Sequence, residues 1–94
     1  MALFVFQGLD KVGALELRKA TREAHLAWIA GLAPRVKIGG PMLSDDGAMP
    51  VGSMLVVETE SLADAKALFA QDPYALAGLW QSTSVRPYNW LIRQ

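Results

Sequence analysis

The sequence contains no cysteine and only one histidine. The lack of cysteine excludes disulfides and thiolate chemistry, and it fits the cytoplasmic location that we expect. A single histidine without cysteine does not favour a transition-metal site, unless a dimer contributes two histidines. We therefore expect no protein-bound metal.

The chain also lacks an excess of either charge, because nine Lys and Arg side chains balance nine Asp and Glu side chains. No basic stretch carries interleaved aromatic residues, so we expect no nucleic-acid partner. No apolar run reaches the roughly 18 residues of a membrane span. The apolar segment 1–6 has no basic leader and does not read as a signal peptide, so we expect no membrane partner.

Motifs for cofactors are missing as well. No Gly-x-Gly-x-x-Gly follows a predicted strand, and Gly39-Gly40-Pro41 is not followed by a Walker lysine. A serine hydrolase is not favoured, since Ser84 lies in no nucleophile elbow. We expect chemistry without a cofactor.

What remains is an apolar, foldable chain of 94 residues, 52% of them hydrophobic. This length predicts one domain over residues 1–94. Such a short chain buries only roughly 60–65% of its unfolded surface, so self-association would add stability.

Local patterns predict alternating strands and helices. The strands are rich in β-branched and aromatic residues, at 3–7, 36–38, 53–58 and 82–88. Helices are predicted at 14–32 and 62–71, with a short helical turn at 74–79. Turns or loops are expected at 39–41 and 44–52, and residues 89–92 are left open as an extension. This order is the ferredoxin-like β-α-β-β-α-β arrangement, an α+β fold.

Both faces of the predicted sheet are apolar. In the first strand Leu3 and Val5 alternate with Phe4 and Phe6, and the third strand alternates in the same way. Two helices cover only one face, so a partner sheet is expected to cover the other. The alternative is that a loop or the C-terminal tail covers it. We expect a homodimer, with higher oligomers left open.

The first helix carries charge on its inward face. At about 100° per residue, Arg18, Arg22 and His25 share one side with the apolar Trp28 and Ile29. Inward charges require partners or a wet pocket, and such departures from the binary pattern mark sites. Two simpler interpretations stay open: the arginines reach the helix edge and pair with surface carboxylates, and the histidine is a hydrogen-bonded core residue.

Several motifs then match a known pattern. Arg22-Glu23-Ala24-His25-Leu26 resembles the Arg-x-x-His-Leu stretch of YciI-like (YCII-related) proteins. Gly39-Gly40-Pro41-Met42 resembles their Gly-Pro turn, and Asp72-Pro73-Tyr74 their Asp-Pro-Tyr segment. Ala77-Gly78-Leu79 and Ser84-Val85-Arg86-Pro87-Tyr88 resemble the segments that follow. The matches occur in the same order and cover nearly the whole chain.

The resemblance implies a ferredoxin-like fold in a dimeric α+β barrel. It also implies a pocket with a histidine and an aspartate, which correspond here to His25 and Asp72. One type of member dehydrochlorinates a chlorinated hydroxyquinol. The wider superfamily includes muconolactone isomerase-like enzymes and cofactor-free monooxygenases.

These residues suit proton transfer. Histidine exchanges protons near neutral pH, and Asp72 as its partner would fix the tautomer, leaving His25 as general base. Arg18 or Arg22 would hold an anionic or enolate oxygen. Tyr74 or Ser84 would add a hydrogen bond. Pro41 completes the predicted substrate-binding set.

Each of these residues also has a structural interpretation. An Asp before Pro, as at Asp72, is common in turns, and Pro41 can simply set a turn. Tyr74 can be a packing residue. Two function classes follow: a cofactor-independent lyase or isomerase acting on a small anionic or aromatic compound, and a non-catalytic small-ligand-binding or assembly domain.

Overall fold

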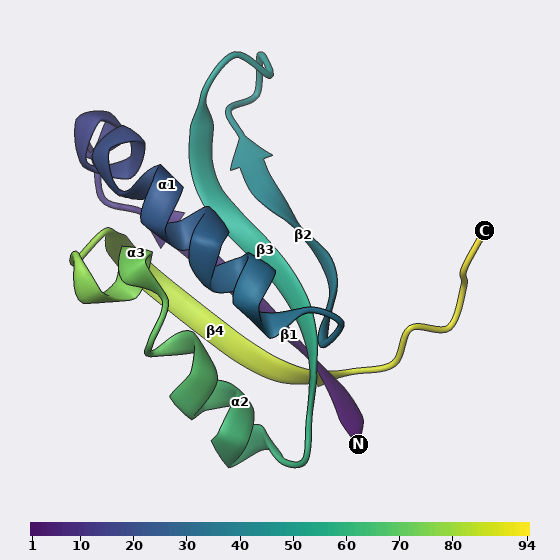
Figure 1. Ribbon diagram of the computed structural model, residues 1–94. Helices are drawn as coiled ribbons and strands as arrows, with labels where there is room; N and C mark the ends of the chain where they lie inside the picture. The colour runs from purple at the N-terminus through teal and green to yellow at the C-terminus, as the bar shows by residue number, and fades with distance from the viewer.

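A computed structural model describes the whole chain, residues 1–94. Its elements follow in the order β1 (Ala2–Asp10), α1 (Leu15–Leu32), β2 (Val36–Leu43), β3 (Pro50–Thr59), α2 (Leu62–Phe69), α3 (Pro73–Leu76) and β4 (Trp80–Tyr88). Figure 1 shows one sheet with the helices on a single side of it. The predicted α+β, ferredoxin-like fold is confirmed, and it is the fold of dimeric α+β barrel proteins.

The four strands form one antiparallel sheet in the order β2-β3-β1-β4. The central strands β1 and β3 are paired along almost their whole length, with Val5 opposite Val56. β2 and β4 are the edge strands. The first and last strands, β1 and β4, are far apart in the sequence but lie side by side in the sheet.

The core lies between the sheet and the helices. Phe4 and Phe6 of β1 point to this side and pack with Ala65 and Phe69 of α2. The rings of Phe6 and Phe69 stack with centroids 4.8 Å apart. Because strand side chains alternate, the neighbouring Val5 lies on the opposite face, which no helix covers.

The prediction for the second strand is wrong in its length. Gly39-Gly40-Pro41 was expected to form a turn, but β2 continues through these residues to Leu43, and Pro41 pairs with Ser53. A proline is tolerated there because β2 is an edge strand, where the missing N–H removes no ladder bond. The hairpin turn is correspondingly shorter, and the amide of Ser44 donates to the carbonyl of Met49 at 2.8 Å.

Smaller differences occur at other boundaries. β3 begins at Pro50, inside the segment expected to be a loop, and α2 ends at Phe69. The Oγ of Ser61 accepts from the amide of Asp64 and caps α2, and serine is a preferred residue at this position. Residues 89–94 form no further strand, and they extend away from the sheet (Figure 1). None of the helices combines the length and apolarity needed to cross a membrane.

Candidate active site

One stripe of α1 forms the wall of a cavity. Arg18, Arg22, His25 and Ile29 are spaced four, three and four residues apart, so their side chains lie on the same face of the helix. The cavity is about 340 Å³ in volume and lies between this stripe and β2. Its lining is completed by Leu26, residues 36–41 of β2, Ser53 and Tyr74. A volume of this size suits a small organic molecule.

His25 is held by Asp72. Nδ1 of the imidazole lies 2.7 Å from Oδ1 of the carboxylate, and both side chains are buried. A carboxylate can only accept hydrogen bonds, so Nδ1 carries the proton in this contact. Nε2 makes no hydrogen bond within the chain, yet it is not among the buried polar atoms that lack a partner. It therefore keeps accessible surface at the cavity.

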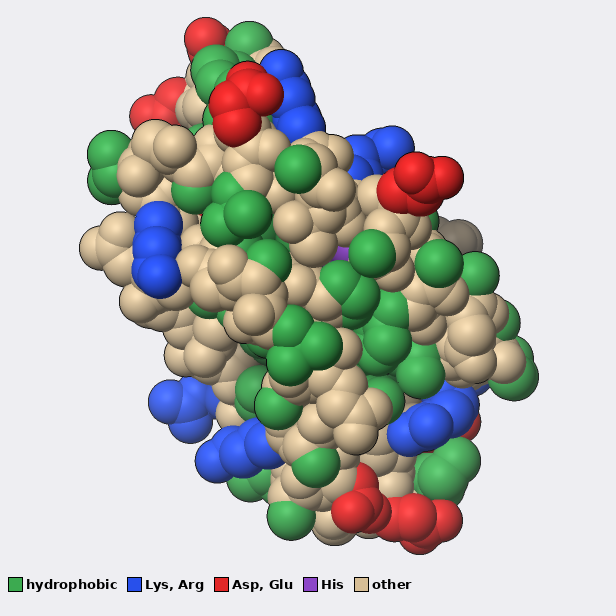
Figure 2. Space-filling view, turned by 60° about the vertical axis from the view of Figure 1, so that its left-hand side comes forward, with side chains coloured by type: hydrophobic (Ala, Val, Ile, Leu, Met, Phe, Trp, Pro, Cys, Tyr) green, Lys and Arg blue, Asp and Glu red, His purple; other side chains and the backbone are tan.

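The space-filling view agrees with this partial access. The single histidine, purple in Figure 2, is visible only as a small area between hydrophobic and uncharged neighbours. Its relative exposure is 6%. The imidazole thus presents only a small area to a ligand that enters the cavity and to bulk water.

Asp72 also organises the segment that follows it. The same Oδ1 accepts from the amide of Tyr74 at 2.9 Å and caps α3, with Pro73 at the first helical position. Its other oxygen, Oδ2, is buried without a partner. The carboxylate therefore joins α1 to α3.

Tyr74 forms the floor of the cavity. It is 1% exposed, and its ring stacks on His25 with centroids 4.0 Å apart. Burial raises the pKa of the Tyr74 phenol above its ordinary value, because ionisation would place a charge where water cannot solvate it. The neighbouring Arg18 and Arg22 oppose that shift without cancelling it. The phenol is thus a neutral hydrogen-bonding group.

Arg18 belongs to a buried polar network. Its Nε and Nη2 donate to the two carboxylate oxygens of Asp10 at 2.7 and 2.9 Å, and Nη2 also donates to Oγ of Ser53 at 2.9 Å. Burial disfavours the charged form, but the hydrogen bond and negative charge of Asp10 outweigh it and raise the pKa of Arg18. The guanidinium also lies 4.7 Å from the ring centroid of Tyr74. Arg18 is a fixed cation.

Arg22 differs from Arg18. It is exposed, lines the same cavity, and takes part in none of the four ion pairs of the chain. Its charge is therefore available to an anion in the cavity. The two arginines that looked equivalent in the sequence have different surroundings.

The structure brings most of the predicted site residues together. Arg18, Arg22, His25, Pro41 and Tyr74 all line this cavity, and Asp72 contacts His25 from behind. Pro41 does so from within β2 instead of from a turn.

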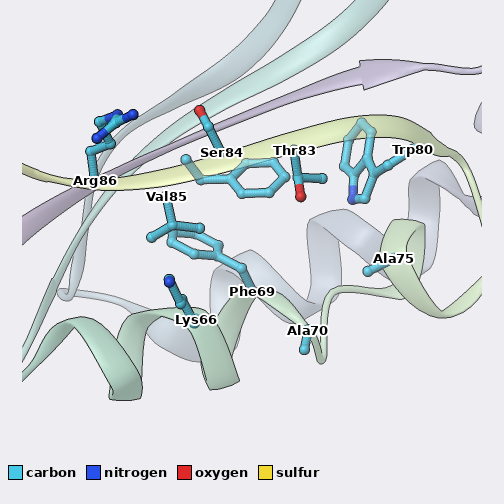
Figure 3. A pocket seen from close by; sticks show the side chains of 10 residues that line it. Lys66, Phe69, Ala70, Ala75, Trp80, Thr83, Ser84, Val85 and Arg86 are labelled. Carbon is cyan, nitrogen blue, oxygen red and sulfur yellow. The ribbon is translucent and has the colours of Figure 1, made fainter.

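Ser84 does not join them. It lies on β4, opposite Gln7 of β1, and two strands separate β4 from β2. Its side chain points to the face of the sheet opposite the helices (Figure 3). The alternation of β4 places Ser84 on the other side from its neighbours Thr83 and Val85. We therefore leave Ser84 out of the site.

Two residues of the network were missed by the sequence analysis. Asp10 ends β1 and holds Arg18. Ser53 interrupts an apolar strand on its buried face and is 3% exposed. A lone hydroxyl on the inward face of a strand was the available signal for Ser53. Nothing local in the sequence pairs Asp10 with Arg18.

No group of three or more His, Asp or Glu side chains is placed to hold a metal ion. The polar groups of the cavity are cations, one imidazole, a phenol and a hydroxyl. These groups are suited to binding an organic anion and moving a proton.

The fold and this pocket define an α+β protein of the ferredoxin-like type, with a polar site between its first helix and an edge strand. Residues 2–89 match the YCII-related domain family. Protein YciI of Escherichia coli is 38% identical over 94 residues, which cover 93% of this chain and 96% of the relative. The chain belongs to the YCII-related family, as the sequence motifs indicate.

Solved structures agree with this assignment. A 5-chloro-2-hydroxyhydroquinone dehydrochlorinase, TftG from Burkholderia phenoliruptrix, in complex with 2,5-dihydroxybenzoquinone, is 32% identical with a TM-score of 0.85, covering 93% of each chain. SnoaB, a cofactor-independent oxygenase from Streptomyces nogalater, is 14% identical with a TM-score of 0.58, covering 98% of this chain and 94% of that one. The second match concerns the fold alone.

Proposed function

We propose that this protein is a cofactor-independent enzyme of the lyase or isomerase type, which moves a proton on a small anionic or aromatic compound. One observation carries the proposal. Nδ1 of His25 is anchored to Asp72, while Nε2 remains accessible at a cavity that an unpaired arginine lines. A base with a fixed tautomer beside a free cation is the arrangement that proton abstraction requires.

The proposed first step is proton abstraction by His25. Nε2 takes a proton from a phenolic hydroxyl, or from a carbon next to a carbonyl, and Asp72 stabilises the imidazolium that results. The electron pair left on the substrate becomes an oxyanion, and Arg22 binds it. The pair then returns to a ring carbon, which takes a proton from the His25 imidazolium, and this completes an isomerisation. Where that carbon bears a leaving group, His25 takes a second phenolic proton, and the electron pair of that O–H bond forms the second carbonyl as the leaving anion departs.

The structural relative supports the elimination form of this reaction. That relative is a dehydrochlorinase for a chlorinated hydroxyhydroquinone and is seen with a dihydroxybenzoquinone. By analogy, the substrate of this chain is a polyhydroxylated aromatic ring. Transfer of one phenolic proton to the chlorine-bearing carbon, followed by loss of a second phenolic proton and of chloride, would convert a chlorohydroquinone-type ring into a quinone with no external oxidant.

Arg18 has a supporting role in the proposed site. Asp10 and Ser53 occupy its donors on one side, so it acts mainly as a fixed positive charge beneath the phenol of Tyr74. Tyr74 stays protonated because of its burial and can donate to a substrate oxygen. Pro41 gives the opposite wall a rigid apolar surface.

One observation favours the alternative of a non-catalytic ligand-binding domain. Asp72 has a structural task, because its Oδ1 caps α3 as well as accepting from His25. In a binder, Asp72 and His25 would maintain the cavity, and Arg22 would hold an anionic ligand without turnover.

We also propose that the protein works as a homodimer. The sheet face opposite the helices carries Leu3, Val5 and Met54, which are only half-buried in the single chain, and no helix covers this face. Packing this face against a second copy would add the buried surface that so short a chain lacks.

The test of the proposed function is chloride release from 5-chloro-2-hydroxyhydroquinone by the wild type, His25→Asn and the matched control Glu23→Gln. Glu23 lies exposed on the same helix. We expect wild type and control to release chloride at the same rate, and His25→Asn to lose about 100-fold or more of it, as loss of a general base does. Equal rates in wild type and His25→Asn would refute the assigned base.

A lack of release by the wild type would refute the dehydrochlorinase form. Calorimetry that measures the binding of 2,5-dihydroxybenzoquinone then separates the two function classes. A ligand that binds equally well to wild type and His25→Asn, without turnover of any related hydroquinone, would favour the binder.

A further inference from the structure

A second cavity lies between the helices and the sheet, at the β4 edge. It is an open cavity of about 600 Å³, larger than the His25 cavity, and it is bordered by α2, α3 and the edge strand β4. The two cavities have no lining residue in common. Figure 3 shows Thr83 and Val85 pointing from β4 into this space, whereas Ser84 and Arg86 point away from it.

Trp80 leaves a hydrogen-bond donor unused at this cavity. Its Nε1 is buried and has no partner in the chain. A buried donor without an acceptor costs about 1–3 kcal/mol, so such atoms are uncommon in native proteins. In Figure 3 the indole nitrogen points away from the sheet, toward α3 and Ala75, and the hydroxyl of Thr83 points to the same side. Because Nε1 has no accessible surface in the free chain, an acceptor oxygen in the cavity would reach it by a small shift of the indole, and would then serve both groups.

A free cation stands at the other end of the cavity. Lys66 extends from α2 beneath Val85 (Figure 3). It takes part in none of the four ion pairs of the chain. Phe69 lies between the two ends and offers an apolar surface, while Ala70 and Ala75 leave room because their side chains are small. The cavity is therefore polar at its ends and apolar in the middle.

We propose that this cavity is a second binding site, for a small planar anion that places an oxygen acceptor at Trp80 and Thr83 and its negative charge at Lys66. A hydroxyaryl carboxylate has this form, with an apolar ring between a hydroxyl and a carboxylate. The site does not depend on the reaction proposed for His25.

A chain of ring contacts links the walls of the two cavities. Trp80 meets the edge of Tyr74 with centroids 5.6 Å apart, and Tyr74 stacks on His25. A ligand that shifts the indole of Trp80 therefore presses on the floor of the His25 cavity. Occupancy of the second site would change the first by this contact.

The three indole N–H groups of the chain, at Trp28, Trp80 and Trp90, permit a direct test. They give separate signals in a ¹⁵N–¹H correlation spectrum, which Trp→Phe variants assign. Titration with 4-hydroxybenzoate should move the Trp80 signal. Lys66→Ala should weaken this binding by about two- to fivefold, since it removes one exposed charge contact. Thr83→Val should weaken it by about fivefold, the effect of one hydrogen bond.

Arg22→Ala is the matched control, because it alters the His25 cavity and leaves the second one intact. The Trp80 shift should persist in this variant with the same Kd. A shift that is lost in Arg22→Ala but unchanged in Lys66→Ala would overturn the proposal, since the ligand would then act from the His25 cavity. An unmoved Trp80 signal in the wild type would also overturn the proposal. The indole N–H would then be explained by a contact with the ring of Tyr74.

Discussion

The imidazole of His25 stacks on the ring of Tyr74, with centroids 4.0 Å apart and planes inclined by 21°. Both rings are positioned by one atom, because Oδ1 of Asp72 accepts from Nδ1 of His25 and from the amide of Tyr74. The orientation of the proposed base and the position of the pocket floor are therefore coupled through a single carboxylate.

Two substitutions at Asp72 should separate its capping role from its charge. Asparagine is about as good an N-cap as aspartate, so Asp72→Asn should retain much of the α3 cap, whereas Asp72→Ala should lose it, at an extra cost of about 0.5–2 kcal/mol. Both variants should lose chloride release if His25 needs the carboxylate. Urea unfolding at one protein concentration measures the first effect. Equal destabilisation by the two substitutions would show that the cap contributes nothing.

The buried ion pair of Arg18 and Asp10 should matter for folding. The two side chains are 6% and 8% exposed, so Asp10→Asn leaves a buried guanidinium without its counter-charge. We expect a loss of about 3–5 kcal/mol in the free energy of unfolding. The control is Glu16→Gln, because Glu16 and Lys19 form an exposed pair at 3.8 Å, and its effect should stay within about 0.5 kcal/mol. Similar losses in both variants would contradict a special role for the buried pair.

The architecture was predictable because it depends on local patterns. Strand alternation in β1 and β3 and the cap at Ser61 are encoded within a few residues, and together they determine the element order. The inward charges of α1 likewise follow from helical spacing alone. The family motifs then linked His25 with Asp72, which are 47 residues apart.

Other features depend on contacts that no local pattern contains. Pro41 lies within a strand because β2 happens to be at the edge of the sheet. Ser84 faces away from the pocket because the register of β4 on β1 sets its side, and one residue's shift would reverse it. The different roles of Arg18 and Arg22 follow from Asp10, which reaches one of them only in the folded chain.

Tyr74 should make the protein sensitive to alkaline pH. Its folded pKa is raised above the unfolded value of 10.0, so its contribution to stability is complete below about pH 10. As the pH rises further, the unfolded chain releases this proton and the folded chain does not, so stability falls until the folded pKa is passed. Tyr88→Phe leaves Tyr74 as the sole tyrosine. Tyrosinate absorbance in that variant should then develop only at pH values above the ordinary pKa of tyrosine.

The pH dependence of unfolding provides the matching check. Tyr74→Phe should remove the part of the alkaline slope that this phenol causes, while Tyr88→Phe should retain it. An absorbance titration of Tyr74 at the ordinary pKa would contradict the burial that the structure shows.

Arg22 should control ligand affinity without controlling stability. It is exposed and unpaired in the free chain, so Arg22→Ala should change the free energy of unfolding by no more than about 0.5 kcal/mol. Loss of a charged hydrogen bond to an anionic ligand should weaken binding of 2,5-dihydroxybenzoquinone by about 10- to 100-fold. Arg35→Ala, which alters an arginine outside the cavity lining, is the control for charge alone. Equal weakening by both variants would assign the effect to net charge.

The proposed homodimer can be broken at the uncovered sheet face. Met54 lies there on the central strand β3, opposite Gln7, and it is half-buried in the single chain. In a monomer, Met54→Lys extends its ammonium group into water at little cost. In a dimer the same charge is buried between two sheets without a partner, which costs several kcal/mol and should drive dissociation. Light scattering coupled to gel filtration should give a dimer for the wild type and for Ala67→Lys on the exposed side of α2, but a monomer for Met54→Lys. A monomeric wild type at micromolar concentration would contradict the proposal.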